Sequence, residues 1–438
     1  MITNIDFFKD AEEENDKKYV EDITKKLIET DDKLFKMTKE NPEYQKYKIK
    51  EKRNKTIITK RCSVTIPRRR YYYFDEILKR NVYVFLLDEY LGIKKWQRTE
   101  NSLREKILSF MGDGKRYRDV IDTVTDSKVS NMTISNIYKN VDLDKIDYIH
   151  INQSNKIDIT GDTIYVQADG TFQTMRDDKT KEKLKEHILI SSIHTGFNKE
   201  KSTEKRPVIE NKKGVFEMNN IPHKIKNLTN IKLFTNKVIE AMHSYNIKKD
   251  TKILVLGDGA NYIETIANAI AKEFKNNILD VSLDKYHLIK KFEHLWSYRK
   301  RNKMQEIKYN VAKYYFYNGK YDELLDLLNS LLPYIVGNKR SYLLKTIKYI
   351  KNNEKGICNQ ILPNNNIGCH MEGDISKAKS VKGRGGKIYN KLTFNNLLTA
   401  SMIKTNSETN MKNNKEMKNI VINKNNLVEV LKVQNLSI

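Results

Sequence analysis

The stretch Lys252-Ile-Leu-Val-Leu-Gly-Asp-Gly-Ala260 carries the clearest fold signal in this chain. Its apolar run suits a buried β-strand and leads to Asp258, which a glycine follows. The stretch Val166-Gln-Ala-Asp-Gly-Thr171 repeats this pattern at Asp169. In open α/β sheets, an acid at the C-terminal end of a strand presents its side chain for catalysis, and glycine lets the backbone turn away. The two stretches therefore predict two acids at one edge of a sheet.

The elements around these stretches follow a ribonuclease H-like order, in which three meandering strands precede alternating helices and strands. We therefore expect an α/β fold with a ribonuclease H-like catalytic core in residues 151–299, closed by residues 357–404. Residues 300–356 are strongly helical and predict an all-α insertion. The expected core strands are 163–168, 188–194, 214–218, 252–256 and 278–283, and the expected core helices are 231–245 and 262–274.

Two segments before the core favour a helix and then a small β element. Residues 1–57 are charged, and their spaced apolar positions predict a helical arm that is either an assembly surface or a solvated helix. Residues 58–95 predict short strands, with Pro67 and a basic bend between them. This bend either binds phosphate groups or is an ordinary solvated hairpin. Its arginines are Arg68, Arg69 and Arg70. The last expected strand is 81–87.

Residues 96–150 predict a helix-turn-helix-like domain. Helices are expected at 117–124 and 130–138, with Ser130 or Asn131 as the N-cap of the second. In a helix-turn-helix the second helix enters the major groove, so Ser130, Asn131 and Thr133 are candidate DNA contacts. Ordinary helical packing is the alternative.

Basic residues dominate the whole chain and its C-terminal part. The 438 residues include 81 Lys and Arg against 56 Asp and Glu, a net charge of +25. This excess favours a nucleic-acid partner, although an AT-rich genome also enriches lysine. Arg384, in a glycine-rich loop, is a candidate DNA-backbone clamp unless the loop is simply flexible. Residues 405–438 predict an Asn- and Lys-rich tail with a short amphipathic helix at 420–431.

Cysteine usage and hydropathy favour a cytoplasmic protein. Three cysteines are too few for a disulfide framework. The N-terminus lacks the pattern of a signal peptide, and the apolar run 82–87 is too short to cross a bilayer.

A third acid completes a candidate metal site. Glu372 lies in Ile367-Gly-Cys-His-Met-Glu-Gly-Asp374. With Asp169 and Asp258 it offers the hard oxygen ligands that Mg²⁺ or Mn²⁺ requires, and two such ions support phosphoryl transfer. Each acid taken alone is equally typical of a turn or a helix cap.

Two neighbouring motifs allow structural and functional interpretations. Asp284 and His287 in Leu283-Asp-Lys-Tyr-His-Leu288 are spaced to share one helix face, where His287 would move a proton, contact a phosphate or serve structurally. The group Cys358, Cys369 and His370 lacks a paired Cys-x-x-Cys and a fourth ligand, which disfavours zinc.

Four blocks of this sequence resemble the ISLre-type insertion-sequence transposases, which belong with the Mutator-like DDE transposases. The blocks are Tyr83–Arg98, Ala-Asp-Gly-Thr with Gly-Asp-Gly-Ala, Leu-Asp-Lys-Tyr-His-Leu and Gly-Cys-His-Met-Glu-Gly-Asp-Ile-Ser. They occur in order over roughly residues 60–400. The resemblance implies that Asp169, Asp258 and Glu372 form a DDE triad, and that Asp284 and His287 match an Asp-x-x-His signature. The sequence departs from the family's pattern after Asp169 and after Glu372. The resemblance therefore does not assign the residues there that contact the substrate.

The resemblance implies an enzyme that cleaves DNA at the terminal inverted repeats of its element and joins the freed 3′-OH to target DNA. It implies two Mg²⁺ or Mn²⁺ ions, DNA as the partner, a homo-oligomer on that DNA, and a bacterial cytoplasmic setting at the nucleoid. A catalytically silent DNA-binding relic or repressor is the alternative, as is another ribonuclease H-like nuclease.

Overall fold

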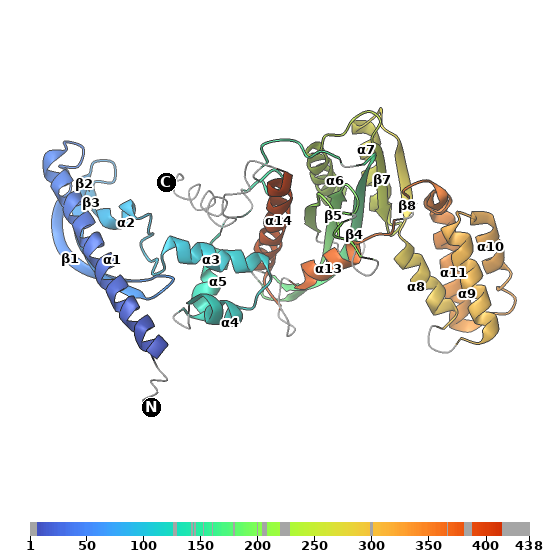
Figure 1. Cartoon of the computed structure of the whole chain (residues 1–438), viewed down its shortest axis with the longest axis horizontal. Helices are drawn as coiled ribbons and strands as arrows, with labels where there is room; N and C mark the ends of the chain where they lie inside the picture. Colours follow the sequence, from blue (N-terminus) through green and yellow to red (C-terminus); the bar gives the residue numbers. More distant parts are fainter. Residues whose placement is uncertain are drawn as a thin grey trace. The chain divides into compact units, whose positions relative to one another are not determined.

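The computed structural model describes residues 7–125, 129–141, 143, 146–151, 153–159, 161–177, 180–198, 200–203, 208–219, 228–297, 301–365, 367–380 and 388–413. The chain divides into two compact units, one up to Val141 and one that follows it (Figure 1). Arg384 and the amphipathic helix expected at 420–431 lie outside the described residues.

The first unit begins with a long helix packed on a small sheet. Helix α1 (Phe7–Glu40) contacts a three-stranded antiparallel sheet of order β1 (Lys48–Ile58), β2 (Ser63–Asp75) and β3 (Arg80–Val84). The apolar stripe of α1 packs against buried sheet residues, so the arm is a packed helix and not a solvated one. The stripe residues are Tyr19, Val20, Ile23, Leu27 and Leu34.

Two strand boundaries in this unit differ from the predicted ones. Residues 48–57, expected in the arm, belong to β1, because pairing with β2 holds this lysine-rich segment in a strand despite its weak β pattern. Strand β3 ends at Val84, and the expected strand 81–87 is wrong beyond it. Leu86 and Leu87 instead bury their side chains from helix α2 (Leu86–Tyr90).

The predicted basic bend is also wrong, because β2 runs without a break through Pro67. Pro67 pairs with Asn54 on one side, and on the other side β3 pairs only with Tyr71 to Asp75. One edge of β2 is therefore unpaired at Pro67, where a missing N–H is tolerated.

Arg68 lies inside this unit as part of a buried ion triad. Its Nη1 lies 2.5 Å from Asp88 Oδ2, and Lys55 Nζ lies 2.9 Å from the same oxygen. Lys55, Arg68 and Asp88 are 8%, 8% and 6% exposed. Two buried cations thus share one carboxylate, and the triad connects β1, β2 and α2.

The rest of the first unit is helical. It contains α3 (Asn101–Gly112), α4 (Tyr117–Val120) with a π-helical turn (Ile121–Thr125), and α5 (Asn131–Lys139). The predicted N-cap is confirmed, because the Thr133 N–H donates to Ser130 Oγ at 3.2 Å. The two compact units divide after Val141, nine residues before the expected domain limit at residue 150, and Tyr148 stacks on Phe216 within the second unit.

The second unit is a mixed α/β structure built on a five-stranded sheet of order β6-β5-β4-β7-β8. β4, β5 and β6 form the expected antiparallel meander, and β7 and β8 continue parallel to β4. The strands are β4 (Thr163–Arg176), β5 (Lys183–His194), β6 (Lys213–Asn219), β7 (Lys252–Gly257) and β8 (Leu279–Leu283).

Helices cover both faces of this sheet (Figure 1). Gly257 faces Ile263 of α7 (Asn261–Glu273), and α7 packs beside α6 (Leu228–His243). On the opposite face, α13 (Met371–Ser380) packs on β4 and β5, and Met402 of α14 (Lys391–Asn413) lies over Gly214 of β6. Residues 405–413, expected in the tail, belong to α14.

The predicted all-α insertion is present, and it follows α8 (Lys285–Leu295). It comprises α9 (Lys303–Tyr317), α10 (Tyr321–Asn329), α11 (Gly337–Asn352) and α12 (Glu354–Cys358), with a 3-10 turn after α12 (Asn359–Ile361). These helices share one apolar core with α8. No helix among the described residues has the length and apolarity to cross a membrane.

Replacing Asp88 with Ala should strongly destabilise the first unit. The change leaves Lys55 and Arg68 buried without a counter-charge, and breaking a buried ion pair in this way costs about 3–5 kcal/mol. Urea denaturation should show this loss in the free energy of unfolding. The control is Glu51→Gln, whose partly exposed pair with Arg70 should contribute little to stability. Equal effects of both changes would contradict the buried triad.

Candidate functional site

Three aspartates lie at one edge of the sheet. In the parallel register Ala168 pairs with Gly257, and Gly257 pairs with Leu283. Backbone pairing therefore places the next residue of each strand at the same level. Those residues are Asp169, Asp258 and Asp284.

Asp169 lies inside β4, which corrects the prediction that this strand stops at Ala168. β4 continues to Arg176 because its pairing with β5 continues to Lys183. Its parallel partner β7 ends at Gly257. The C-terminal edge of the parallel part of the sheet therefore still falls at Asp169.

The acids at this edge share one electrostatic environment. Burial, together with the Asp258 and Asp284 carboxylates, raises the pKa of Asp169 to about 6, against the opposing effects of the Gly170 N–H and His287. Burial also raises the pKa of Asp284, and the Asp258 and Glu372 carboxylates add to the effect. Like charges so close together favour protonation or a bound cation.

A buried glutamine connects Asp169 with Glu372. Gln167, which is fully buried on β4, donates from Nε2 to the Gly368 carbonyl at 3.3 Å and accepts from the His370 N–H at 2.8 Å. Asp169 is two residues after Gln167 on the same sheet face, and Glu372 is two residues after His370. One amide therefore holds the chain just ahead of two predicted metal ligands.

Side chains at the start of α8 interact with Asp284 and Glu372. Asp284 is the N-cap of α8 and accepts from the Tyr286 N–H at 3.1 Å. Burial and a hydrogen bond with the Glu372 carboxylate raise the pKa of Tyr286. His287 Nε2 lies 3.7 Å from Asp284 Oδ2, so the expected Asp-x-x-His pair is formed on one helix face.

His187 is a further site residue, and sequence reasoning missed it. An ideal Cβ at Gly170 would lie 2.6 Å from His187 Nε2, so the ring approaches the backbone directly after Asp169. Burial lowers the pKa of His187, and the Asp258 carboxylate opposes that effect. Its position depends on the pairing of His187 with Phe172 across β4 and β5. No local motif indicates that pairing.

The helical insertion contacts the site at Asp258. Tyr349 of α11 donates its hydroxyl to the Asp258 carbonyl at 2.6 Å, and Tyr262 of α7 donates to Asp258 Oδ1 at 3.2 Å. Gly259 has a φ of +76°, and an ideal Cβ there would lie 2.2 Å from Asn353 Oδ1. A glycine is therefore required where the insertion packs on this turn.

The two cysteines considered for zinc are separate. Cys358 is exposed at the end of α12, whereas Cys369 is partly buried beside the site acids. Burial and the nearby Asp284 carboxylate raise the pKa of the Cys369 thiol. The Cys369 thiol is therefore uncharged near neutral pH in the metal-free protein.

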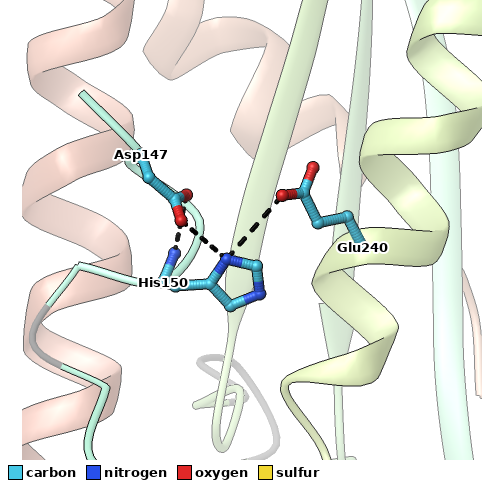
Figure 2. A group of neighbouring side chains, drawn as sticks. All are labelled: Asp147, His150 and Glu240. Carbon is cyan, nitrogen blue, oxygen red and sulfur yellow. Dashed lines mark hydrogen bonds and ion pairs between the residues drawn. The ribbon is translucent and has the colours of Figure 1, made fainter. Parts of the chain in front are cut away.

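A different group has the tightest clustering of possible metal ligands among the described residues. Asp147, His150 and Glu240 place one ligand atom each within 4.8 Å of the others (Figure 2). Asp169, Asp258 and Glu372 do not meet that criterion in the same described part of the chain. His150 Nδ1 lies 2.8 Å from Asp147 Oδ2, and Asp147 Oδ1 accepts the His150 N–H. These contacts are those of a capped surface turn.

The predicted DNA contacts have different surroundings. Arg69 pairs with Asp31 and Asp32 of α1 at 2.6 and 2.7 Å, and Arg70 pairs with Glu51 at 2.9 Å. With Arg68 in the buried triad, none of the three forms the expected phosphate-binding turn. Ser130 and Asn131 are exposed at the start of α5, whereas Thr133 is half-buried.

Replacing Asp169 with Asn should stabilise the metal-free protein above pH 6. Because the folded-state pKa of Asp169 is raised, its contribution to stability is present below pH 4 and lost as the pH rises through about 6. The raised pKa corresponds to at most about 3 kcal/mol, and solvent screening at this half-buried position reduces the expected gain to about 1 kcal/mol. Urea titrations in EDTA at several pH values measure it. Asp250→Asn, an exposed change before β7, is the control, and a gain that does not vary with pH would contradict the prediction.

Comparison with known proteins identifies the family. A family model matches residues 4–381 and therefore spans both units. No curated protein matches the chain. The matched range includes Asp169, Asp258, Asp284 and Glu372. The chain belongs to the uncharacterised protein family UPF0236.

Proposed function

We propose that this protein is a DDE transposase with a ribonuclease H-like core. It cleaves DNA at the terminal inverted repeats of its element and transfers the 3′-OH strand to target DNA. The observation that carries the proposal is the placement of Asp169, Asp258 and Asp284 at one edge of the sheet, with Glu372 of α13 near enough to Asp284 to help raise its pKa. The meander of β4 to β6 followed by alternating helices and strands supports the ribonuclease H-like assignment.

The residue types at this edge fit Mg²⁺ or Mn²⁺. Asp169, Asp258 and Glu372 supply hard oxygen ligands, and no described Lys or Arg forms an ion pair with them. Burial and the neighbouring carboxylates raise the pKa values of Asp169 and Asp284, and a bound cation would favour their charged forms. When bound, two divalent ions would stabilise charge on the entering and leaving oxygens of a phosphodiester.

The other site residues have positioning and proton-transfer roles in this proposal. Asp284 orients His287 from the first turn of α8, and His287 transfers a proton or contacts the scissile phosphate. Tyr262 and Tyr349 fix the Asp258 turn through their hydroxyls. Gln167 sets the distance between Asp169 and Glu372.

The DNA partner follows from charge and from the helices of the first unit. The net charge of +25 favours a polyanion. Helix α5 has a confirmed N-cap and an exposed first turn, as a recognition helix requires. We propose that Ser130, Asn131 and Thr133 contact DNA ends, and that the protein acts as a homo-oligomer.

Asp258→Asn should abolish strand cleavage and transfer. The change removes one negative ligand from the cluster and retains the side-chain size. The measurement is an end-cleavage and strand-transfer assay with purified protein, inverted-repeat DNA and Mg²⁺ or Mn²⁺. Asp250→Asn is the matched control and should retain activity. Cleavage by Asp258→Asn would sink the assignment. End binding without cleavage by the wild-type protein would indicate a silent relic, and a preference for branched DNA would indicate another nuclease.

Gln167→Leu should weaken metal binding more than it weakens folding. The substitution removes both hydrogen bonds that hold the segment before Glu372, so a higher Mn²⁺ concentration should be needed for half-saturation. Electron paramagnetic resonance of Mn²⁺ measures this concentration directly. Gln167→Glu keeps the acceptor for the His370 N–H and should show a smaller effect. If Gln167→Leu binds Mn²⁺ as the wild-type protein does, Gln167 has no positioning role.

A further inference from the structure

Helix α11 has an unusual charge composition. Its sixteen residues include five cations and no acid, whereas the whole chain has 81 basic and 56 acidic residues. Among the described helices of ten or more residues, α11 alone has no Asp or Glu. The five cations are Lys339, Arg340, Lys345, Lys348 and Lys351.

Four of the five cations follow one side of a helix that is anchored from its other sides. Leu343, Thr346, Ile347 and Ile350 are buried in the insertion core. Tyr349 reaches the Asp258 carbonyl from a second side. The third side is an exposed surface that we call the α11 stripe, and it extends over about 16 Å at 1.5 Å per residue. It consists of Arg340, Ser341, Leu344, Lys345, Lys348 and Lys351.

Acidic side chains within the insertion do not neutralise this stripe. In the described part of the chain, Arg340, Lys345, Lys348 and Lys351 form no ion pair. The neighbouring helix α10 has the opposite composition, with Asp322, Glu323 and Asp326 and no cation. The two helices pack together, yet no described ion pair joins them. Acidic and basic side chains therefore lie on separate helices and are not interspersed, as expected for a surface that binds a charged partner.

We propose that the α11 stripe binds the phosphate backbone of duplex nucleic acid. A row of uncompensated cations with a serine among them suits phosphate oxygens and carries no base specificity. An anionic membrane is a poorer match. A membrane-surface helix inserts its apolar face, whereas the apolar face of α11 is buried in the protein.

This inference deepens the proposed function by naming a second DNA surface, but the stripe's binding requires no catalysis. It is therefore tested without divalent metal, on a duplex of arbitrary sequence. If the protein shows no catalysis, the inference about the α11 stripe still holds. If the stripe does not bind duplex DNA, the proposed chemistry is unaffected.

The first test compares two triple variants of the full chain by fluorescence anisotropy over about 50 to 200 mM salt. Arg340→Gln/Lys345→Gln/Lys348→Gln should weaken duplex binding and reduce the slope of log K against log salt by about 2 to 3. The control Lys17→Gln/Lys18→Gln/Lys26→Gln removes the same charge from exposed positions of the acid-rich helix α1. It should leave the slope near that of the wild-type protein. Equal slopes for both variants would overturn the proposal.

The second test uses the wild-type protein, so it does not depend on how a variant folds. Lysines are acetylated briefly with and without duplex DNA, and the modified sites are quantified by mass spectrometry. Lys345 and Lys348 should be protected by DNA, whereas Lys17 and Lys18 should not. Absence of protection at Lys345 and Lys348 would overturn the proposal. So would protection by phosphatidylserine vesicles without protection by DNA.

Discussion

The pairing of β4 with β7 is the constraint on which the candidate site depends. This parallel register fixes Ala168 beside Gly257, and the next pairing fixes Gly257 beside Leu283. Three aspartates then stand in a row whose side chains repel one another. The hydrogen-bonded backbone holds them there, and burial together with this repulsion raises the pKa values of Asp169 and Asp284. A site of this kind costs stability in the metal-free protein, and a bound cation would restore it.

Charge is used in two ways in this chain. In the first unit, cations are paired with acids inside the structure: Arg68 and Lys55 share Asp88, and Arg69 bridges two aspartates of α1. In the insertion, α10 and α11 keep their charges apart. The same residue types therefore stabilise the fold in one place and leave a charged surface in another. Net charge alone does not distinguish these uses.

Much of the core was accessible from the sequence because its elements have strong periodicity. The apolar run before Asp258 and the helical pattern of 300–356 both correspond to elements of the structure. The basic residues 68–70 did not follow their local pattern. A proline next to three arginines is typical of a turn, but pairing with β1 and the acids of α1 and α2 keep that segment in a strand. Local propensity was outweighed by tertiary contacts.

The sequence by itself determined the order of the elements and which acids follow which strands, because apolar periodicity and glycine positions are local properties of the chain. Only the tertiary structure decided which side chains share a site. The bridge from Gln167 to residues 368 and 370, the approach of His187 to Gly170 and the contact of Tyr349 with Asp258 join residues far apart in sequence. Such contacts depend on strand register and on how helices dock against a sheet. Neither of these leaves a repeating pattern along the chain.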